Sequence, residues 1–208
     1  MENCMKIIIG LIYLLLFLTN IINAQGVPCP GTPTVIYAGK TYNTVQIGSQ
    51  CWLKENLDVG IMILGIDTTN NNGVIEKYCY DNDTNNCNTY GGLYQWNEVM
   101  QYSTTEGARG ICPSGWHIPT YTEFQTLSTT VGGEGNALKA IGQGSDAGAG
   151  TNTSGFTALF SGTRSLNGNF YYLGVSPYFW SSTEYDARDA GMMSLIYYNS
   201  FVFCFNEQ

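Results

Sequence analysis

The stretch "GICPSGWHIPTYTEFQTLSTTVGG", Gly110 to Gly133, contains the beginning, body and end of one predicted helix. Thr120 and Glu123 form a Thr-x-x-Glu capping box, in which each side chain can satisfy a free backbone N–H of the first turn. Gly132 and Gly133 end the helix. Its apolar stripe consists of Phe124, Leu127 and Val131. The stretch therefore predicts an amphipathic helix with one face packed on a core.

The same stretch holds the only histidine of the chain, His117. General acid–base chemistry near neutral pH most often uses histidine, so the role of this residue decides whether a catalytic site is expected. Trp116 and Ile118 give the segment an apolar anchor, and Pro119 fixes the turn into the helix. No second titrating group stands nearby in sequence to form a relay. We expect His117 to hydrogen-bond locally as scaffold, and we assign no catalytic residue.

Periodic segments flank this helix on both sides. Upstream, "GGLYQWNEVMQY" places Leu93, Trp96, Val99 and Met100 on one helical face, which predicts a first helix. Further upstream, "TVIYAGKTYNTVQIGSQCWL" alternates apolar and polar residues around Gly39-Lys40, as a hairpin would.

The second half of the chain is rich in strand and turn signals. Residues 136–156 are Gly-rich and are expected to form a long loop, a candidate for binding, with at most one helical turn near 137–141. Asn167-Gly168 lies between aromatic and apolar runs and predicts a hairpin. "YFWSST" and "MMSLIYYNSFVFCF" are strand-like. The order of strands, helices and strands predicts an α+β fold with an antiparallel sheet.

The N-terminus indicates an exported protein, and the overall charge limits its partners. Residues 1–24 read as a signal peptide, with an N-terminal membrane anchor as the alternative, and residues 25–208 read as a single domain. The protein would then contact the membrane only through the signal peptide during export, and the mature protein would be secreted or held at the cell surface. The net charge of −8, with eight Lys and Arg residues, argues against a nucleic-acid partner.

The cysteines after residue 24 are even in number, which in an exported chain favours disulfides. Cys79 and Cys87 bracket the turn-rich "YDNDTNN" and form the first predicted pair. Cys29 with Cys51 is the second. Zinc is not expected, because no Cys-x-x-Cys or histidine-containing ligand set is present. The remaining cysteines, whose pairing stays open, are Cys112 and Cys204.

Two acidic segments are candidates for calcium, and no other cofactor is expected. Asp81, Asp83 and Asn85 alternate oxygen ligands like the first half of a calcium loop, but the loop's Gly and distal Glu are absent. A turn closed by a disulfide also explains these residues without a metal. The second segment follows "WSST" and contains Glu184, Asp186 and Asp189.

Five blocks of the chain together resemble one known family. They are "GKTYNTVQIGSQCWLKENL", "CYDNDTNNCNTYGGLYQWNEVM", "GICPSGWHIPTYTEFQTL", "NTSGFTALFSGTRSLNGNFYYLG" and "YFWSSTE". In this order they are similar to the Fibrobacter succinogenes major paralogous domain, found in exported bacterial proteins. The resemblance implies a C-type-lectin-like fold, with two helices against twisted antiparallel sheets and long loops. The family has no established molecular function.

The end of the chain departs from the family pattern. Family members usually finish with a segment resembling Gly-Phe-Ser-Val-Arg-Cys, whereas this sequence finishes with "SFVFCFNEQ". The resemblance therefore implies that the C-terminal strand is missing and that Cys112 lacks its expected partner. Cys112 is then either free or paired with Cys204.

Three functions stay open at this point. A secreted or cell-surface recognition or adhesion module would bind glycan or protein through exposed aromatic and polar side chains. The residues expected to do so are Tyr171, Tyr172, Tyr178, Tyr185 and Glu184. An enzyme related to formylglycine-generating enzymes is the second possibility, since those proteins have a similar Leu-Pro-Thr-x-x-Glu helix entry. It would need a redox-active cysteine pair that no positions here supply. The third possibility is a structural unit of a surface assembly.

Overall fold

The first sheet is the antiparallel hairpin expected near the N-terminus, extended by one strand. The computed structural model describes residues 26–186 and 189–207, so the predicted signal peptide lies outside the described residues. Strands β1 (Thr34–Tyr37), β2 (Lys40–Ile47) and β3 (Gln50–Leu53) pair in the order β1-β2-β3. Ala38 and Gly39 form the first turn with φ of 49° and 80°, as a tight hairpin turn requires. The predicted hairpin is confirmed.

Helix α4 (Tyr121–Thr130) begins and ends where the sequence predicts. Its capping box is complete: the Thr120 hydroxyl accepts from the Glu123 N–H at 3.1 Å, and the Glu123 carboxylate accepts from the Thr120 N–H at 2.8 Å. Phe124 is buried and stacks on Trp52 of β3, with ring centroids 5.7 Å apart. This contact packs the helix on the first sheet.

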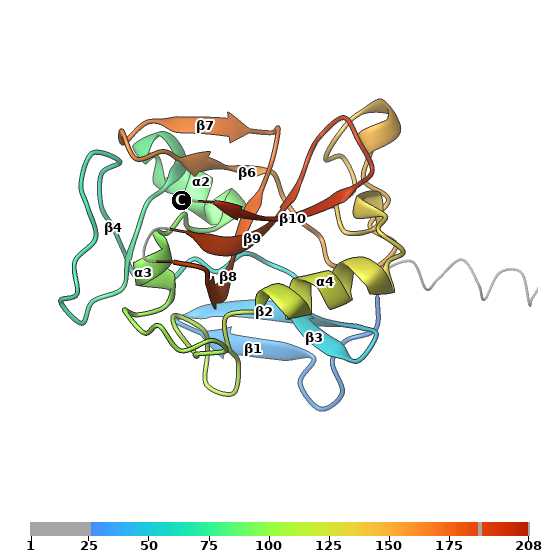
Figure 1. Ribbon diagram of the computed structural model, residues 1–208, viewed down its shortest axis with the longest axis horizontal. Coiled ribbons are helices and arrows are strands. Elements are labelled where there is room, and N and C mark those ends of the chain that lie inside the picture. Colours follow the sequence, from blue (N-terminus) through green and yellow to red (C-terminus); the bar gives the residue numbers. More distant parts are fainter. Residues whose placement is uncertain (1–25, 187–188, 208) are drawn as a thin grey trace, which may run out of the picture.

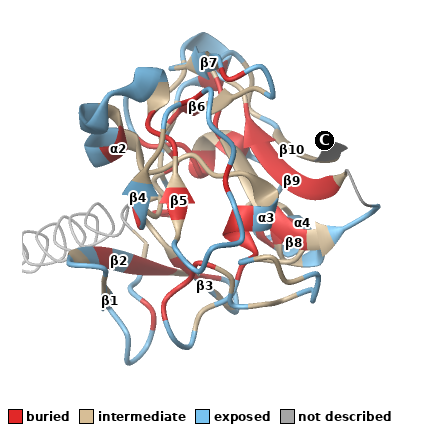
Figure 2. Ribbon diagram, turned by 90° about the vertical axis from the view of Figure 1, so that its left-hand side faces the viewer, coloured by how far each residue is buried: buried red, intermediate tan, exposed pale blue. Residues whose placement is uncertain are grey.

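The C-terminal sheet lies on the other side of α4 (Figure 1). Strands β8 (Tyr178–Glu184), β9 (Ala190–Leu195) and β10 (Val202–Glu207) pair antiparallel in the order β10-β9-β8. The central strand β9 is buried along its whole length, as the red ribbon in Figure 2 shows. The main core is therefore enclosed by the first sheet, α4 and β9.

Two smaller strand pairs complete the sheets. Strands β6 (Ser161–Arg164) and β7 (Phe170–Leu173) form the predicted hairpin around Asn167-Gly168. Strands β4 (Ile61–Met62) and β5 (Glu76–Lys77) form a short parallel pair. Helices and mostly antiparallel sheets together confirm the predicted α+β class.

Two predictions about the other helices were wrong: the first predicted helix is shorter than expected, and an additional helix is present. The predicted helix on the Leu93–Met100 face is only α3 (Trp96–Val99), because Leu93 pairs with Tyr78 as a β-bridge and Gln101 turns left-handed at φ 49°. The prediction of two helices was also too low, since a further helix follows Cys79. The remaining helical elements are η1 (Tyr80–Asn82), α2 (Thr84–Tyr90), η2 (Gly135–Ala137) and η3 (Asp146–Gly148).

Both predicted disulfides are present. Cys29 is bonded to Cys51 with Cα atoms 5.7 Å apart, and Cys79 to Cys87 with Cα atoms 5.0 Å apart. These bonds indicate folding in an oxidising compartment. Among the residues that the structure describes, no helix is long and apolar enough to cross a membrane.

The Gly-rich region that was expected to be a loop is anchored by a buried lysine. Lys139 is 0% exposed, and its ammonium donates to the Asn136 side chain at 2.9 Å and to three main-chain carbonyls. The carbonyls belong to Gly148 (2.7 Å), Ile196 (2.8 Å) and Asn199 (2.6 Å). Burial lowers the pKa of Lys139. This one side chain therefore ties residues 136–148 to the β9–β10 connection.

Candidate functional site

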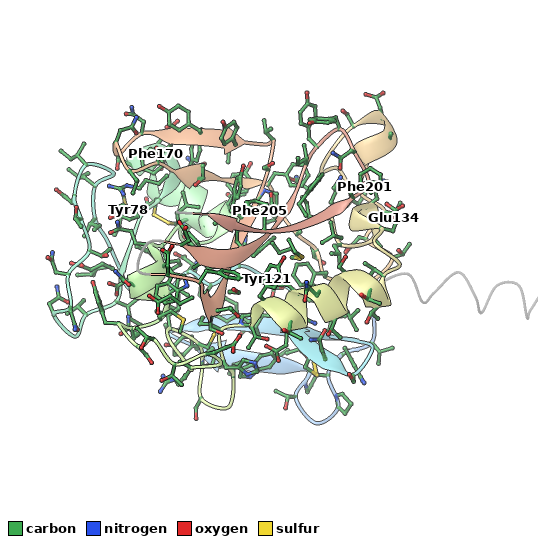
Figure 3. The ribbon with its side chains drawn as sticks, in the orientation of Figure 1. Tyr78, Tyr121, Glu134, Phe170, Phe201 and Phe205 are labelled. Atoms are coloured by element: carbon green, nitrogen blue, oxygen red, sulfur yellow. A yellow bond between two sulfur atoms is a disulfide. The ribbon has the colours of Figure 1, made fainter. Side chains whose placement is uncertain are left out.

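Four aromatic rings from β7, β8 and β10 form a continuous row, which we call the tyrosine row: Tyr171, Tyr172, Tyr178 and Phe205. The ring centroids are 6.2 Å apart for Tyr171 and Tyr172, 6.5 Å for Tyr172 and Tyr178, and 6.4 Å for Tyr178 and Phe205. Tyr171 is 42% exposed and Tyr172 is 53% exposed. Figure 3 places Phe205 on β10, below the β6–β7 hairpin. The fold therefore brings three of the predicted binding tyrosines together.

Tyr172 lies in a backbone conformation that tyrosine rarely adopts. Its φ is +66°, in the left-handed region that favours glycine. The conformation is held by the turn that ends β7, where the Tyr172 carbonyl accepts from the Val175 N–H at 2.9 Å and from the Ser176 N–H at 3.1 Å. Strain of this kind costs about 1–3 kcal/mol and concentrates at functional positions. Little burial compensates for it here, because about half of the side chain is exposed.

The Asn-Gly turn of the hairpin supplies amides beside the first ring of the row. The Asn167 and Asn169 side chains donate to the Tyr171 hydroxyl at 3.4 and 3.5 Å. These hydrogen bonds lower the pKa of Tyr171. Asn167 also accepts from the Asn169 N–H at 3.0 Å, which fixes the turn. The end of the row therefore combines an aromatic face with carboxamide groups.

A large cavity adjoins the tyrosine row. Its volume is about 1340 Å³, and its lining includes Tyr171, Tyr172 and Tyr178 at one side and Gln50–Leu53 of β3 at another. The volume exceeds the range of about 300–1,000 Å³ that is usual for small-molecule sites. The three tyrosines of the row and β3 are thus parts of one extended lining, to which Phe205 does not belong.

The other two predicted binding residues lie outside the tyrosine row, although Glu184 belongs to the lining of the same cavity. Tyr185 follows β8 at its far end and packs on Tyr121 of α4, with ring centroids 5.8 Å apart. Glu184 is exposed at the end of β8, opposite Ala190. Among the described residues, neither side chain has a ring contact with the tyrosine row. Four of the five predicted residues therefore line one cavity, and Tyr185 is the one outside its lining.

The first calcium candidate is used for helix capping. Asp83 is the N-cap of α2, and its carboxylate accepts from the Asn85 N–H at 2.9 Å. Asp81 belongs to the preceding turn, with φ of +54°. Within residues 26–186 and 189–207, no group of three histidine, cysteine or acidic side chains could hold a metal ion. The expected turn forms η1 and the start of α2.

His117 contacts the helix cap, and both His117 and Glu123 belong to the lining of the large cavity. Its Nε2 lies 3.0 Å from both carboxylate oxygens of Glu123, which also accepts from the Thr120 N–H. Burial raises the pKa of Glu123, but the hydrogen bonds from Thr120 and His117 outweigh burial and lower it overall. The expected local hydrogen bond of His117 is confirmed, and it supports the capping box.

The two cysteines whose pairing was open are both free thiols. Cys112 is buried in the smaller core cluster, and Cys204 is half-buried on β10. Burial raises the pKa of Cys112 to about 12 and also raises the pKa of Cys204. Both thiols are therefore protonated near neutral pH, unlike the reactive cysteines of redox enzymes.

Two features of these surroundings were not foreseen. Phe205 extends the tyrosine row, although the sequence analysis placed it only in a strand-like run. Arg164 stacks over the Tyr78 ring at 4.5 Å and donates to the Gly65 carbonyl at 2.6 Å. Both depend on segments that are far apart in the chain, so no local pattern points to them.

The comparisons with known proteins identify one family. Residues 45–204 match the model of the Fibrobacter succinogenes major domain, which covers most of the chain. No curated protein sequence and no solved structure matches the chain. On the strength of the family match, the chain belongs to the Fibrobacter succinogenes major domain family.

Proposed function

We propose that this protein is a secreted or cell-surface recognition module without catalytic activity, and that its tyrosine row binds glycan. The likeness of the family to C-type lectins, drawn from the sequence, is part of this proposal. Export through the N-terminal segment is also part of this proposal. The two disulfides support it, because they indicate folding in an oxidising compartment.

One observation carries the proposal: an exposed Tyr172 occupies a left-handed position where glycine would be free of strain. A side chain that contributes little burial and strains its backbone is poorly explained by stability alone. Its ring lies between those of Tyr171 and Tyr178, and the three together offer neighbouring aromatic surfaces.

The chemistry of the row suits a sugar. Aromatic rings provide an apolar surface with a polar hydroxyl at one end, which matches the C–H face and the hydroxyl rim of a pyranose. The carboxamides of Asn167 and Asn169, next to the Tyr171 hydroxyl, can donate to and accept from sugar hydroxyls. Aromatic stacking with a few oriented polar groups is the usual composition of a small-molecule site.

A glycan array with the oxidised protein tests the proposal. We expect binding to a defined subset of glycans that Tyr172→Ala weakens about tenfold, equivalent to about 1.4 kcal/mol. Tyr198→Ala is the matched control, because Tyr198 is 57% exposed and packs only on Tyr197 among the described aromatic contacts. An array without specific binding, or equal effects of the two substitutions, would contradict the proposal.

The same protein preparations distinguish the alternatives. Oxidation of a peptide cysteine that disappears in Cys112→Ser would support an enzyme related to formylglycine-generating enzymes. A protein that neither binds glycan nor turns over substrate would fit a structural unit of a surface assembly.

A further inference from the structure

Strand β3 has a free edge. The Lys54 N–H donates to the Asn43 carbonyl at 2.9 Å, so the alternation of an antiparallel ladder directs the backbone groups of Cys51 and Leu53 away from β2. Among the described residues, the main-chain N–H and C=O groups of Cys51 and Leu53 make no backbone hydrogen bond on that outer side. This edge can accept a further strand.

The large cavity described above lies along this edge. Besides Gln50–Leu53, its lining includes Cys112 and Ile118 from the smaller core cluster and Phe179 and Trp180 from β8. Strand β3 and these apolar side chains thus line one cavity of about 1340 Å³. A chain segment lying there would pair with backbone on one side and bury side chains on the other.

Buried polar atoms in the lining lack partners. The Trp52 indole N–H and the Gln50 side-chain oxygen are both buried, and neither has a hydrogen-bond partner among the described residues. One is a donor and the other an acceptor. A polypeptide backbone offers both an acceptor and a donor at each residue, whereas an apolar ligand offers neither. These atoms favour a peptide as the occupant.

The charge of the lining favours a basic segment. Its carboxylates are Glu55, Glu123, Glu184, Asp186 and Asp189, and the Asp189 Oδ1 is buried without a partner among the described residues. Glu55 and Glu123 already accept hydrogen bonds, from Asn43 and from Thr120 and His117. The Lys and Arg side chains of the lining are Lys54 and Arg164, and Arg164 is bonded to the Gly65 carbonyl. The whole chain carries a net charge of −8. Cationic side chains on the occupant would complement this lining.

We infer that the cavity receives an extended, basic segment of a partner polypeptide, which adds to the free edge of β3. Main-chain hydrogen bonds to Cys51 and Leu53 provide affinity, and alternate apolar side chains enter the cavity beside Phe179 and Trp180. This inference does not rest on glycan binding, because it uses β3 rather than the tyrosine row.

Fluorescence anisotropy with labelled peptides tests the inference. The probe is a peptide of about six residues, typical of a strand, that alternates valine and lysine. We expect saturable binding with a Kd of about 10–100 µM. The same peptide methylated on alternate backbone nitrogens should bind at least about tenfold more weakly, and a valine–glutamate peptide should not bind. Absence of saturable binding, or equal binding of the methylated peptide, would overturn the inference.

Protein variants locate the binding edge. Leu53→Pro removes an N–H that points away from β2, so it should preserve the sheet and abolish peptide binding. Ile36→Pro is the matched control, because the Ile36 N–H points away from β2 on the opposite edge of the sheet. Hydrogen exchange on the unaltered protein should show protection of Cys51 and Leu53 by the peptide. If Leu53→Pro does not fold, hydrogen exchange on the unaltered protein tests the location instead. Exchange rates of the Cys51 and Leu53 amides that the peptide leaves unchanged would refute binding at this edge.

Discussion

Replacing Lys139 with methionine tests how the Gly-rich region is held in place. Methionine keeps the length and the apolar part of the side chain but removes the ammonium. Four acceptors then lose a donor: the Asn136 side chain and the carbonyls of Gly148, Ile196 and Asn199. The substitution therefore separates the hydrogen bonds of Lys139 from its packing on Phe160, whose ring centroid lies 5.9 Å from the ammonium.

The expected loss follows from these four bonds. A buried acceptor without a donor costs about 1–3 kcal/mol, which gives about 4 kcal/mol at the lower value. Removal of a buried charge returns part of this, because burial disfavours the ammonium and lowers the pKa of Lys139. We expect a net loss of about 3 kcal/mol in the free energy of unfolding. For a chain of this size, that corresponds to a Tm lower by about 6–12 °C.

Urea unfolding under non-reducing conditions, followed by tryptophan fluorescence, measures this loss. Lys54→Met is the matched control: Lys54 is only half-buried, and among the described residues its ammonium makes no ion pair or hydrogen bond. It should change stability by less than about 0.5 kcal/mol. If Lys139→Met unfolds within about 0.5 kcal/mol of the unaltered protein, the anchoring role derived for Lys139 is wrong.

The helix cap and the small disulfide give three further predictions. Thr120→Ala should cost about 1 kcal/mol through loss of the cap, whereas His117→Gln should cost less than about 0.5 kcal/mol, and thermal melts compare them. The pKa of Glu123 is lower in the folded protein, so its stabilisation is present above its ordinary pKa and is lost as the pH falls through the lowered value. Urea titrations at stepped acidic pH should show this loss, and Glu123→Gln should remove it. Opening Cys79–Cys87, with a separation of 8, should cost about 2.5 kcal/mol by loop-closure entropy, which unfolding of the double serine variant measures.

Local signals were sufficient to predict the parts of the fold that depend on neighbouring residues. The capping box of α4, the Asn167-Gly168 hairpin and the Cys79–Cys87 bond each depend on residues close in sequence. The helix predicted on the Leu93–Met100 face is shorter than expected, because Leu93 forms a β-bridge with Tyr78 and the backbone turns left-handed at Gln101.

The candidate site was predictable only in part, since its assembly depends on distant segments. Aromatic composition pointed to Tyr171, Tyr172 and Tyr178, but equally to Tyr185, which packs on α4 instead. The strained φ of Tyr172 is held by the hydrogen bonds of a turn, and hydrophobic periodicity in the sequence does not predict such bonds. Lys139 was likewise unremarkable in the sequence, because three of its acceptors are carbonyls that the fold brings to it.

If Tyr172 is kept for a ligand and not for the fold, the substitution Tyr172→Gly should separate ligand binding from stability. Glycine relieves the left-handed strain at φ +66°, so the free energy of unfolding should fall by no more than about 1 kcal/mol. Calorimetric titration with the strongest glycan from the array should show an affinity at least about tenfold lower than that of the unaltered protein. Unchanged glycan affinity in a stably folded Tyr172→Gly protein would contradict the account.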